Sequence, residues 1–320
     1  MLATLRLCLR GGALKLLHPD HPSSLGHELI FSHLPFSKGG CLPGRQGGFE
    51  GYFLSNSIYA TLGEMEKKEI DKIHVIDAHA HLDELTDLNE SLQEARAAGV
   101  HGIIAVGMDV ESNRKVLQIA GANPGYVYPA LGYHPWRIKE EEVEANLSFI
   151  REHVREEMAL GEIGLDYKIK VKKELQWRIF GEILDIALES NKPVIVHCRF
   201  SHRRAFEMVK EKKIKRAVFH WYSGPVDLLD KILSMGYFIS ATPALVYSPP
   251  HREAIQRAPI ERILLETDTP VSYQGREARP KDVRMSLEEM AKLKRLEPSD
   301  VAAQTTANAS EFFQIPFRKN

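Results

Sequence analysis

From about residue 73 onward, short apolar runs alternate with segments whose apolar positions recur at helical spacing. Eight apolar runs occupy residues 73–79, 102–107, 126–132, 158–165, 193–198, 217–220, 236–240 and 262–266. Helical patterns cover 88–98, 140–157, 172–190, 201–212 and 281–295, and three more begin near residues 110, 225 and 251. Continuous apolar runs are typical of parallel strands that are buried on both faces. The pattern therefore predicts eight parallel strands, each followed by a helix.

This alternation and its length predict an α/β fold, a (β/α)8 TIM barrel, over residues 65–320. A barrel of this type usually needs about 250 residues, which this segment supplies. A doubly wound open sheet is the competing architecture. The first apolar run is not followed by a GxGxxG motif, and no Walker lysine loop occurs in the sequence. Folds that bind nucleotide cofactors through those motifs are therefore disfavoured.

Residues 1–64 lack this alternation of apolar runs and helical patterns. They contain glycine pairs at 39–40 and 47–48, and no strand or helix period persists beyond about a dozen positions. We expect an extension that is disordered or is not part of the native protein, in which case Met65 is the natural start. Because residues 1–19 lack acidic residues and carry Arg6, Arg10 and Lys15, a transit peptide is a further alternative.

Composition narrows the class of protein. Lys and Arg number 42 against 43 Asp and Glu, so no global basic field is available to coat long nucleic acid or an anionic membrane. No apolar run reaches 18 residues, so we expect no membrane span. The three cysteines, Cys8, Cys41 and Cys198, form no CxxC motif or disulfide framework, which predicts a reduced, cytoplasmic setting. The sequence gives no sign of an obligate protein partner.

Polar residues stand where the predicted strands end. His79 and His81 are two residues apart in the first strand, so their side chains share a face and can converge on one metal ion. Later strands end at Glu162, His197 and His220, and the last strand ends in Glu266-Thr-Asp268. We expect Glu266 and Asp268 to share a face and take Asp268 as the ligand. Cys198 follows His197 directly and is expected to point away from it into packing.

The carboxyl ends of barrel strands meet at one end of the fold, where the active sites of barrel enzymes lie. Four histidines and two carboxylates there suit a pair of divalent ions, with zinc or manganese favoured and magnesium less suited to histidine. Taken singly, each residue has a structural alternative, such as a carboxylate paired with an arginine. Six at one end predict a metal site formed by His79, His81, Glu162, His197, His220 and Asp268.

Six motifs in this order, DAHAHLDE, LGYHP, GEIGLDY, VIVHCR, FHWYSG and LLETDTP, resemble those of the TatD family of metal-dependent hydrolases, amidohydrolase-like barrels. The resemblance covers residues 73–313, including a closing helix around Thr306-Ala-Asn308-Ala309. It implies that Glu162 bridges two metals, that His134 lies on the substrate side and that Arg199 contacts a phosphate. The sequence departs from the family after Pro270, where Val271-Ser-Tyr-Gln replaces a tyrosine-leucine and proline-rich loop. In the family that loop helps to shape the pocket, so this departure bears on which substrate is bound.

The resemblance implies a TatD-type deoxyribonuclease that cleaves phosphodiester bonds from the 3′ end with a water activated by two metals. Asp268 would hold this water and accept its proton, with Glu162 and His134 as the other catalytic residues. Arg199 and His134 would bind the substrate, a DNA end or another small phosphodiester. Four aromatic residues flank the site in sequence and are candidates for stacking a terminal base, with packing at the barrel rim as the alternative: Tyr133, Trp136, Trp221 and Tyr222. Arg203 and Arg204 would form a basic lip or a solvated helix face.

Two other functions are compatible with these residues. A deacylase, lactonase or amidase could attack a carbonyl group with the same pair of metals, because a barrel does not fix the reaction. A scaffold without enzymatic activity could retain the site as a relic. Activity towards esters or amides without activity towards phosphodiesters would select the first, and failure to bind any metal would select the second.

Overall fold

The computed structural model describes residues 6–10, 13–17, 73–154 and 159–317. The chain divides into two units, Met1–Glu69 and Ile70–Asn320. In the first unit, strand β1 (Arg6–Arg10) pairs antiparallel with strand β2 (Ala13–Leu17). Most of residues 1–64, and the proposed start at Met65, lie outside the described residues. The interpretation of this segment as an extension therefore stays a prediction.

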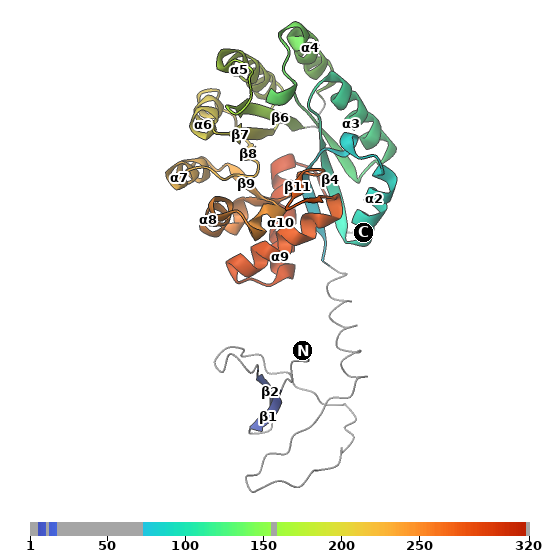
Figure 1. Cartoon of the computed structure of the whole chain (residues 1–320), viewed down its shortest axis with the longest axis vertical. Helices are drawn as coiled ribbons and strands as arrows, with labels where there is room; N and C mark the ends of the chain where they lie inside the picture. Colours follow the sequence, from blue (N-terminus) through green and yellow to red (C-terminus); the bar gives the residue numbers. More distant parts are fainter. Residues whose placement is uncertain (1–5, 11–12, 18–72, 155–158, 318–320) are drawn as a thin grey trace. The chain divides into compact units, whose positions relative to one another are not determined.

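The second unit contains a sheet of eight parallel strands (Figure 1). Strands that are consecutive in the chain are neighbours in the sheet, which is the order of a TIM barrel and not of a doubly wound sheet. The predicted (β/α)8 barrel is thus confirmed. Its strands are β3 (Val75–Ala80), β4 (Val100–Val106), β5 (Val127–Leu131), β6 (Ala159–Asp166), β7 (Val194–Arg199), β8 (Ala217–Phe219), β9 (Phe238–Ala241) and β10 (Ile263–Leu265).

The barrel closes between β3 and the segment that follows β10. Ala80 forms a parallel bridge with Thr269. The Asp268 N–H donates to the carbonyl of His79 at 3.0 Å, and the His81 N–H donates to the carbonyl of Thr269 at 2.8 Å. Closure therefore depends on the backbone of residues whose side chains the sequence assigns to a metal site.

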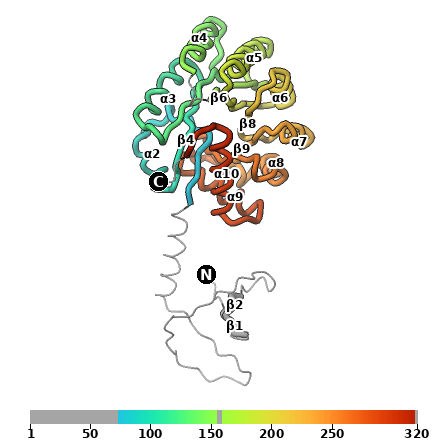
Figure 2. The backbone as a smooth tube through the Cα atoms, turned by 180° about the vertical axis from the view of Figure 1, so that it is seen from behind, coloured from blue at the N-terminus to red at the C-terminus, as the bar shows by residue number. Residues whose placement is uncertain are grey.

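Helices surround the strands on the outside (Figure 2). They are α2 (Leu88–Ala97), α3 (Val110–Ala122), α4 (Val143–His153), α5 (Lys173–Glu189), α6 (His202–Glu211), α7 (Val226–Ser234), α8 (Pro249–Arg257), α9 (Val283–Lys294) and α10 (Pro298–Phe313). Short 3₁₀ turns span Leu82–Glu84, Pro135–Arg137, Glu140–Glu142, Pro243–Val246, Ile260–Arg262 and Pro280–Asp282, and β11 (Ser272–Tyr273) pairs with β12 (Arg276–Glu277). None of the helices in the described part of the chain is long and apolar enough to cross a membrane.

One predicted helix was too long. The segment 140–157 begins with the 3₁₀ turn Glu140–Glu142, and α4 itself runs only from Val143 to His153. The helix starts where apolar residues begin to recur at helical spacing, because Val143, Leu147 and Ile150 are the residues that it buries. The three consecutive glutamates before it bury nothing.

The inside of the barrel is filled by side chains from all eight strands, and α10 closes it at the amino ends of the strands. The cluster consists of Ile76, Ala78, Ile104, Val106, Ala130, Ala159, Ile195, Val218, Phe238 and Leu264, with Ala309, Phe312, Phe313 and Ile315 packed against them. Asn308 of α10 donates to the carbonyl of Ile263, and Thr306 donates to that of His74. This end is apolar and covered, so polar chemistry is confined to the carboxyl end.

We expect deletion of residues 1–64 to leave the barrel folded, because its strands, its closure and its α10 cap all lie within residues 73–317. The thermal midpoint of the truncated chain, followed by circular dichroism, should stay within a few degrees of that of the full chain. Hydrolytic activity should be retained. An insoluble product, or one that melts far below the full chain, would contradict this expectation.

Candidate metal centre

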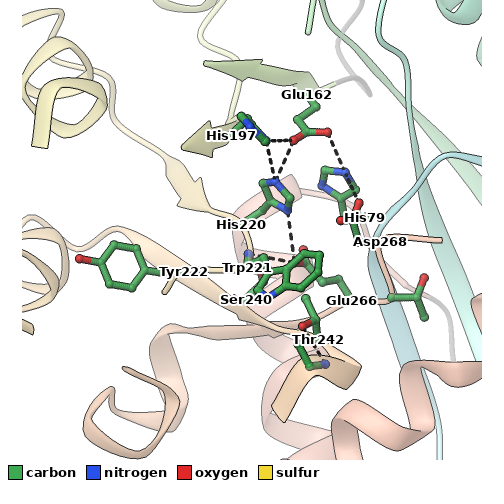
Figure 3. Close-up of polar contacts among 12 residues, drawn as sticks. His79, Glu162, His197, His220, Trp221, Tyr222, Ser240, Thr242, Glu266 and Asp268 are labelled. Carbon is green, nitrogen blue, oxygen red and sulfur yellow. Dashed lines mark hydrogen bonds and ion pairs between the residues drawn. The ribbon is translucent and has the colours of Figure 1, made fainter. Parts of the chain in front are cut away.

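The structure brings all six predicted ligand residues together, with His134 beside them, at the carboxyl end of the barrel. Figure 3 shows five of the six, His79, Glu162, His197, His220 and Asp268. Each is buried, at 9% exposure or less. They come from five strands or from the residue or loop directly after each: His79, His81, Glu162, His197, His220 and Asp268. The described partners of Glu162 and Asp268 are histidines, not the arginines that a structural role would require.

Four side-chain atoms form a first donor set: His79 Nε2, His81 Nε2, Glu162 Oε2 and Asp268 Oδ1. The two imidazole nitrogens lie 3.3 Å apart, and each lies 3.3 Å from Glu162 Oε2. Asp268 Oδ1 lies 3.4 Å from His79 and 3.5 Å from His81. Ligands bound at about 2.0–2.1 Å in a tetrahedral site stand about 3.3–3.4 Å from one another. The first donor set therefore has the spacing that a zinc-like divalent ion requires.

The other oxygen of Glu162 faces a second donor set, made of His197 Nδ1 and His220 Nε2. Glu162 Oε1 lies 2.6 Å from the former and 2.8 Å from the latter, and the two nitrogens are 3.5 Å apart. One carboxylate thus presents one oxygen to each donor set. A carboxylate placed in this way could be shared between two metal ions.

His134 also lies near Glu162, with its Nε2 3.3 Å from Oε1, but its hydrogen bonding argues against a ligand role. The Trp136 N–H donates to His134 Nδ1 at 3.1 Å, so in the neutral imidazole the proton sits on Nε2. Burial lowers the pKa of His134 to about 4, which keeps it neutral near pH 7. In this tautomer His134 donates a hydrogen bond into the site through Nε2, although its position beside Glu162 and His197 also makes it part of a possible metal-binding group.

Two further carboxylates lie beside the far nitrogens of the second donor set, and only the contact of Asp166 with His197 is a hydrogen bond. Asp166 Oδ2 lies 3.3 Å from His197 Nε2, and Glu266 Oε1 lies 3.4 Å from His220 Nδ1. Partners of this kind fix the orientation of metal-binding imidazoles. Sequence reasoning gave Asp166 no role, although it ends the GEIGLDY motif at the carboxyl end of β6, which is the signal that could have identified it.

Glu266 and Asp268 both reach the centre, each in a group that includes His79, but strand alternation is not what places them there. Strand β10 ends at Leu265, and Asp268 has a left-handed backbone with φ of 54°, so strand alternation no longer applies. Glu266 faces His220 and accepts the Trp221 N–H at 3.0 Å, whereas Asp268 faces His79 and His81. The preference for Asp268 over Glu266 in the first donor set agrees with this geometry.

Glycines allow the strands that carry these residues to approach closely. A Cβ atom on Gly164, whose φ is 147°, would lie 2.0 Å from the carbonyl oxygen of His197. A Cβ on Gly132 would lie 2.4 Å from the carbonyl oxygen of Glu162. The glycines of the LGYHP and GEIGLDY motifs are therefore required by contacts that position the site.

The electrostatics of the centre suit a cation. Burial alone would favour the neutral acid, but four surrounding histidines hold the pKa of Glu162 well below its ordinary value. Burial alone would also lower the pKa of His81, but its hydrogen bonds to Asp268 and Glu162 raise it to about 10. Without a metal, protons on histidine balance the buried carboxylates only in part. Divalent ions would replace those protons.

Of the four aromatic residues predicted as stacking candidates, two are buried and do not line the rim of the site. Tyr133 and Tyr222 are 1% and 0% exposed, and their hydroxyls donate to the carbonyls of Lys139 and Pro225, so neither can stack a base. Trp136 is 53% exposed and Trp221 is half-buried. The aromatic side chain of Tyr222 points away from the centre in Figure 3.

The basic residues of the rim differ in role. The Arg199 side chain is 46% exposed, and its Nε lies 3.3 Å from Asp166 Oδ2. Arg203 pairs with Asp227, and Arg204 lies near Glu207 and Glu211, which favours the solvated helix face over the basic lip. Cys198 packs against the core as predicted.

Comparison with known proteins agrees with this geometry. Residues 76–314 match the family model described as TatD related DNase. The chain belongs to the TatD family of metal-dependent hydrolases. An uncharacterized metal-dependent hydrolase from Methanocaldococcus jannaschii is 31% identical over 249 residues, which cover 76% of this chain and 98% of that protein.

Two further relatives of this TatD-family chain are informative. A protein named 3'-5' ssDNA/RNA exonuclease TatD, from Erwinia tasmaniensis, is 30% identical over 244 residues, covering 72% of this chain and 94% of that protein. The crystal structure of a TatD homologue from Escherichia coli gives a TM-score of 0.69 at 27% identity, covering 77% of this chain and all of that one. The buried clusters of histidine, glutamate and aspartate are those of a metal-dependent hydrolase.

Metal binding to this TatD-family chain should release protons and strengthen as the pH rises. In the metal-free protein His81 keeps its proton up to a pKa of about 10, so a metal must displace that proton at neutral pH. We expect the apparent affinity for Zn²⁺ to rise about tenfold per pH unit for each proton displaced between pH 6 and 9. Calorimetry in two buffers of different ionisation enthalpy measures the release. An affinity independent of pH, with no proton released, would contradict the assignment.

Proposed function

We propose that this TatD-family hydrolase cleaves phosphodiester bonds at the ends of single-stranded DNA, as a deoxyribonuclease of the 3′-exonuclease type. The observation that carries the proposal is the guanidinium of Arg199, half-exposed at the rim and fixed by the buried Asp166 beside the second donor set. A guanidinium recognises phosphate through two parallel hydrogen bonds. The name of the relative from Erwinia tasmaniensis supports the same substrate class.

Two divalent ions, zinc, manganese or magnesium, would fit the two donor sets. His79, His81 and Asp268 would hold the first, His197 and His220 the second, and Glu162 would be shared between them. When bound, such ions polarise a phosphoryl oxygen and lower the pKa of a bound water towards neutrality. The imidazole-rich donors favour zinc or manganese over magnesium.

The side chains have distinct roles in this proposal. Asp268 orients the attacking water and accepts its proton. His134 remains neutral above pH 4 and donates its Nε2–H to a non-bridging oxygen or to the leaving group. Arg199 holds the phosphate, and the exposed ring of Trp136, only 5.6 Å from the Arg199 guanidinium, is placed to stack on a terminal base. A cytoplasmic location also remains a proposal.

Replacement of Asp268 tests the catalytic assignment. Asp268→Asn keeps the size of the side chain but removes its charge and basicity, so we expect kcat to fall about 10²–10⁴-fold under saturating metal. The barrel should remain folded, with little change in the thermal midpoint. Asp185→Asn is a matched control, because Asp185 is an aspartate on α5 that pairs with Lys212 outside the barrel. It should leave kcat unchanged.

A structural role for Asp268 would give the opposite pattern. The thermal midpoint of Asp268→Asn would fall, and the molecules that remained folded and metal-loaded would keep a near-normal kcat. That outcome would remove Asp268, and the loop after β10, from the reaction.

The substrate class is tested by assaying the metal-loaded chain on labelled single-stranded DNA, a small chromogenic phosphodiester, a lactone and an acylated amine. We expect hydrolysis of both phosphodiesters, with products shortened from the 3′ end of the DNA. Hydrolysis of the lactone or the amide without cleavage of either phosphodiester would select the deacylase, lactonase or amidase alternative and overturn the proposal.

A further inference from the structure

An exposed phenylalanine lies directly beside the candidate phosphate-binding arginine. Phe200 is 67% exposed, the highest value among the exposed large apolar residues of the described chain. It follows the last residue of β7 and has a left-handed backbone with φ of 58°. That conformation is unfavourable for a bulky residue with a Cβ atom. An aromatic ring held in water by a strained backbone indicates a contact surface for a ligand.

The loop between β6 and α5 supplies positive charge next to this ring. Four exposed lysines lie within the seven residues after the strand, the last of them at the start of α5: Lys168, Lys170, Lys172 and Lys173. The Lys168 Nζ lies 5.1 Å from the centre of the Phe200 ring, so the ammonium and the ring face the same space. Arg199 adds a fifth cation at the end of β7. This local charge contrasts with the net charge of −1 for the whole chain.

Asp166 connects this surface to the metal centre. Its buried carboxylate accepts the Trp136 Nε1–H at 2.6 Å and the Lys168 backbone N–H at 2.8 Å. The same carboxylate lies 3.3 Å from both Arg199 Nε and His197 Nε2. Burial and hydrogen bonding therefore fix the rim residues relative to the second donor set. Lys168 and Phe200 adjoin these rim residues, since Lys168 is bound to Asp166 through its backbone and Phe200 follows Arg199 in the chain.

The neighbouring sector of the rim has the opposite charge. The loop between β5 and α4 contains three consecutive acids, Glu140–Glu142, and Arg137 in that loop pairs with Glu84. That loop also carries the exposed Trp136 and Lys139, but Lys139 pairs with Glu142, whereas none of the lysines in the loop after β6 forms an ion pair with another described residue. A polyanion that extends from the centre is attracted towards the lysines after β6 and repelled by the glutamates after β5.

We infer that Phe200 and the lysine loop, residues 168–173, form a binding track for the part of a single-stranded polynucleotide that extends away from the scissile bond. Phe200 stacks on a base, and Lys168 neutralises a phosphate next to that base. Stacking on an aromatic side chain combined with backbone contacts to lysine is how proteins hold single strands without reading sequence. The inference rests on the proposed phosphodiesterase function and adds an extended substrate to it.

Two variants test the track. Phe200→Asn removes the ring, and asparagine tolerates the left-handed backbone, so the loop keeps its conformation. Lys168→Met removes one charge and keeps an unbranched side chain. Leu188→Ala and Lys210→Met are matched controls, because these exposed residues lie on α5 and α6 away from the loops of the track. All variants are made in the full chain and loaded with the same metal.

Each variant is assayed on single-stranded DNA of about twelve nucleotides and on a small chromogenic phosphodiester. Phe200→Asn should raise KM for the oligonucleotide about tenfold, the loss expected for one stacked base, and leave kcat/KM for the small diester unchanged. Lys168→Met should weaken oligonucleotide binding and reduce the slope of log affinity against log salt by about 0.7, the value for one phosphate of a single strand. The controls should change neither.

The outcomes separate the track from the function on which it rests. If the unmodified chain cleaves neither substrate, the proposed function fails. If it cleaves both and the two variants bind and cleave the oligonucleotide like the unmodified chain, the track is wrong and the function stands. Equal losses on both substrates would also overturn the track, because they would show that the variants disturb the metal centre itself.

Discussion

The structure depends on one buried carboxylate, Glu162, which faces five histidines. Burying ionisable groups costs several kcal/mol for each ion unless opposite charge is supplied. The two oxygens of Glu162 face different donor sets, so the charge of one side chain is divided between them. Protons on histidine balance the buried carboxylates only in part, whereas divalent ions would supply opposite charge at both donor sets. Metal binding and the integrity of this end of the barrel are therefore coupled.

The two ends of the barrel differ in polarity, and this difference confines the charged groups to one end. At the amino ends, α10 covers the interior with Phe312 and Phe313, so no polar group is needed there. At the carboxyl end, barrel closure between His79–His81 and Asp268–Thr269 joins the residues of the first donor set through backbone hydrogen bonds. Asp166 then connects the second donor set to the rim. The residues that close the barrel are thus neighbours of those that would bind metal and of those that would contact the substrate.

The eight strands and the ligand set were predictable from the sequence because period and residue type carry that information. His197 and His220 follow the alternation set by the interior residues Ile195 and Val218. His79 and Glu162 do not follow the alternation. Ile76 and Ala78 point into the barrel, so regular alternation would turn His79 outward, and the interior position of Ala159 would likewise turn Glu162 outward. Register shifts between Asp77 and Ala80, and between Leu160 and Ile163, turn these two side chains inward. Such register shifts cannot be predicted from the pattern of hydrophobic residues.

Other features depend on contacts that only the folded chain makes. The burial of Tyr133 and Tyr222, the tautomer of His134 set by the Trp136 N–H and the support of His197 by Asp166 are of this kind.

The central claim is that Glu162 is shared by two divalent ions. It is tested most directly by anomalous diffraction from crystals loaded with Zn²⁺ or Mn²⁺. Two peaks about 3.5–4 Å apart are predicted, with one oxygen of Glu162 bound to each. A single peak among His79, His81 and Asp268, or Glu162 bound to one ion through both oxygens, would contradict the account.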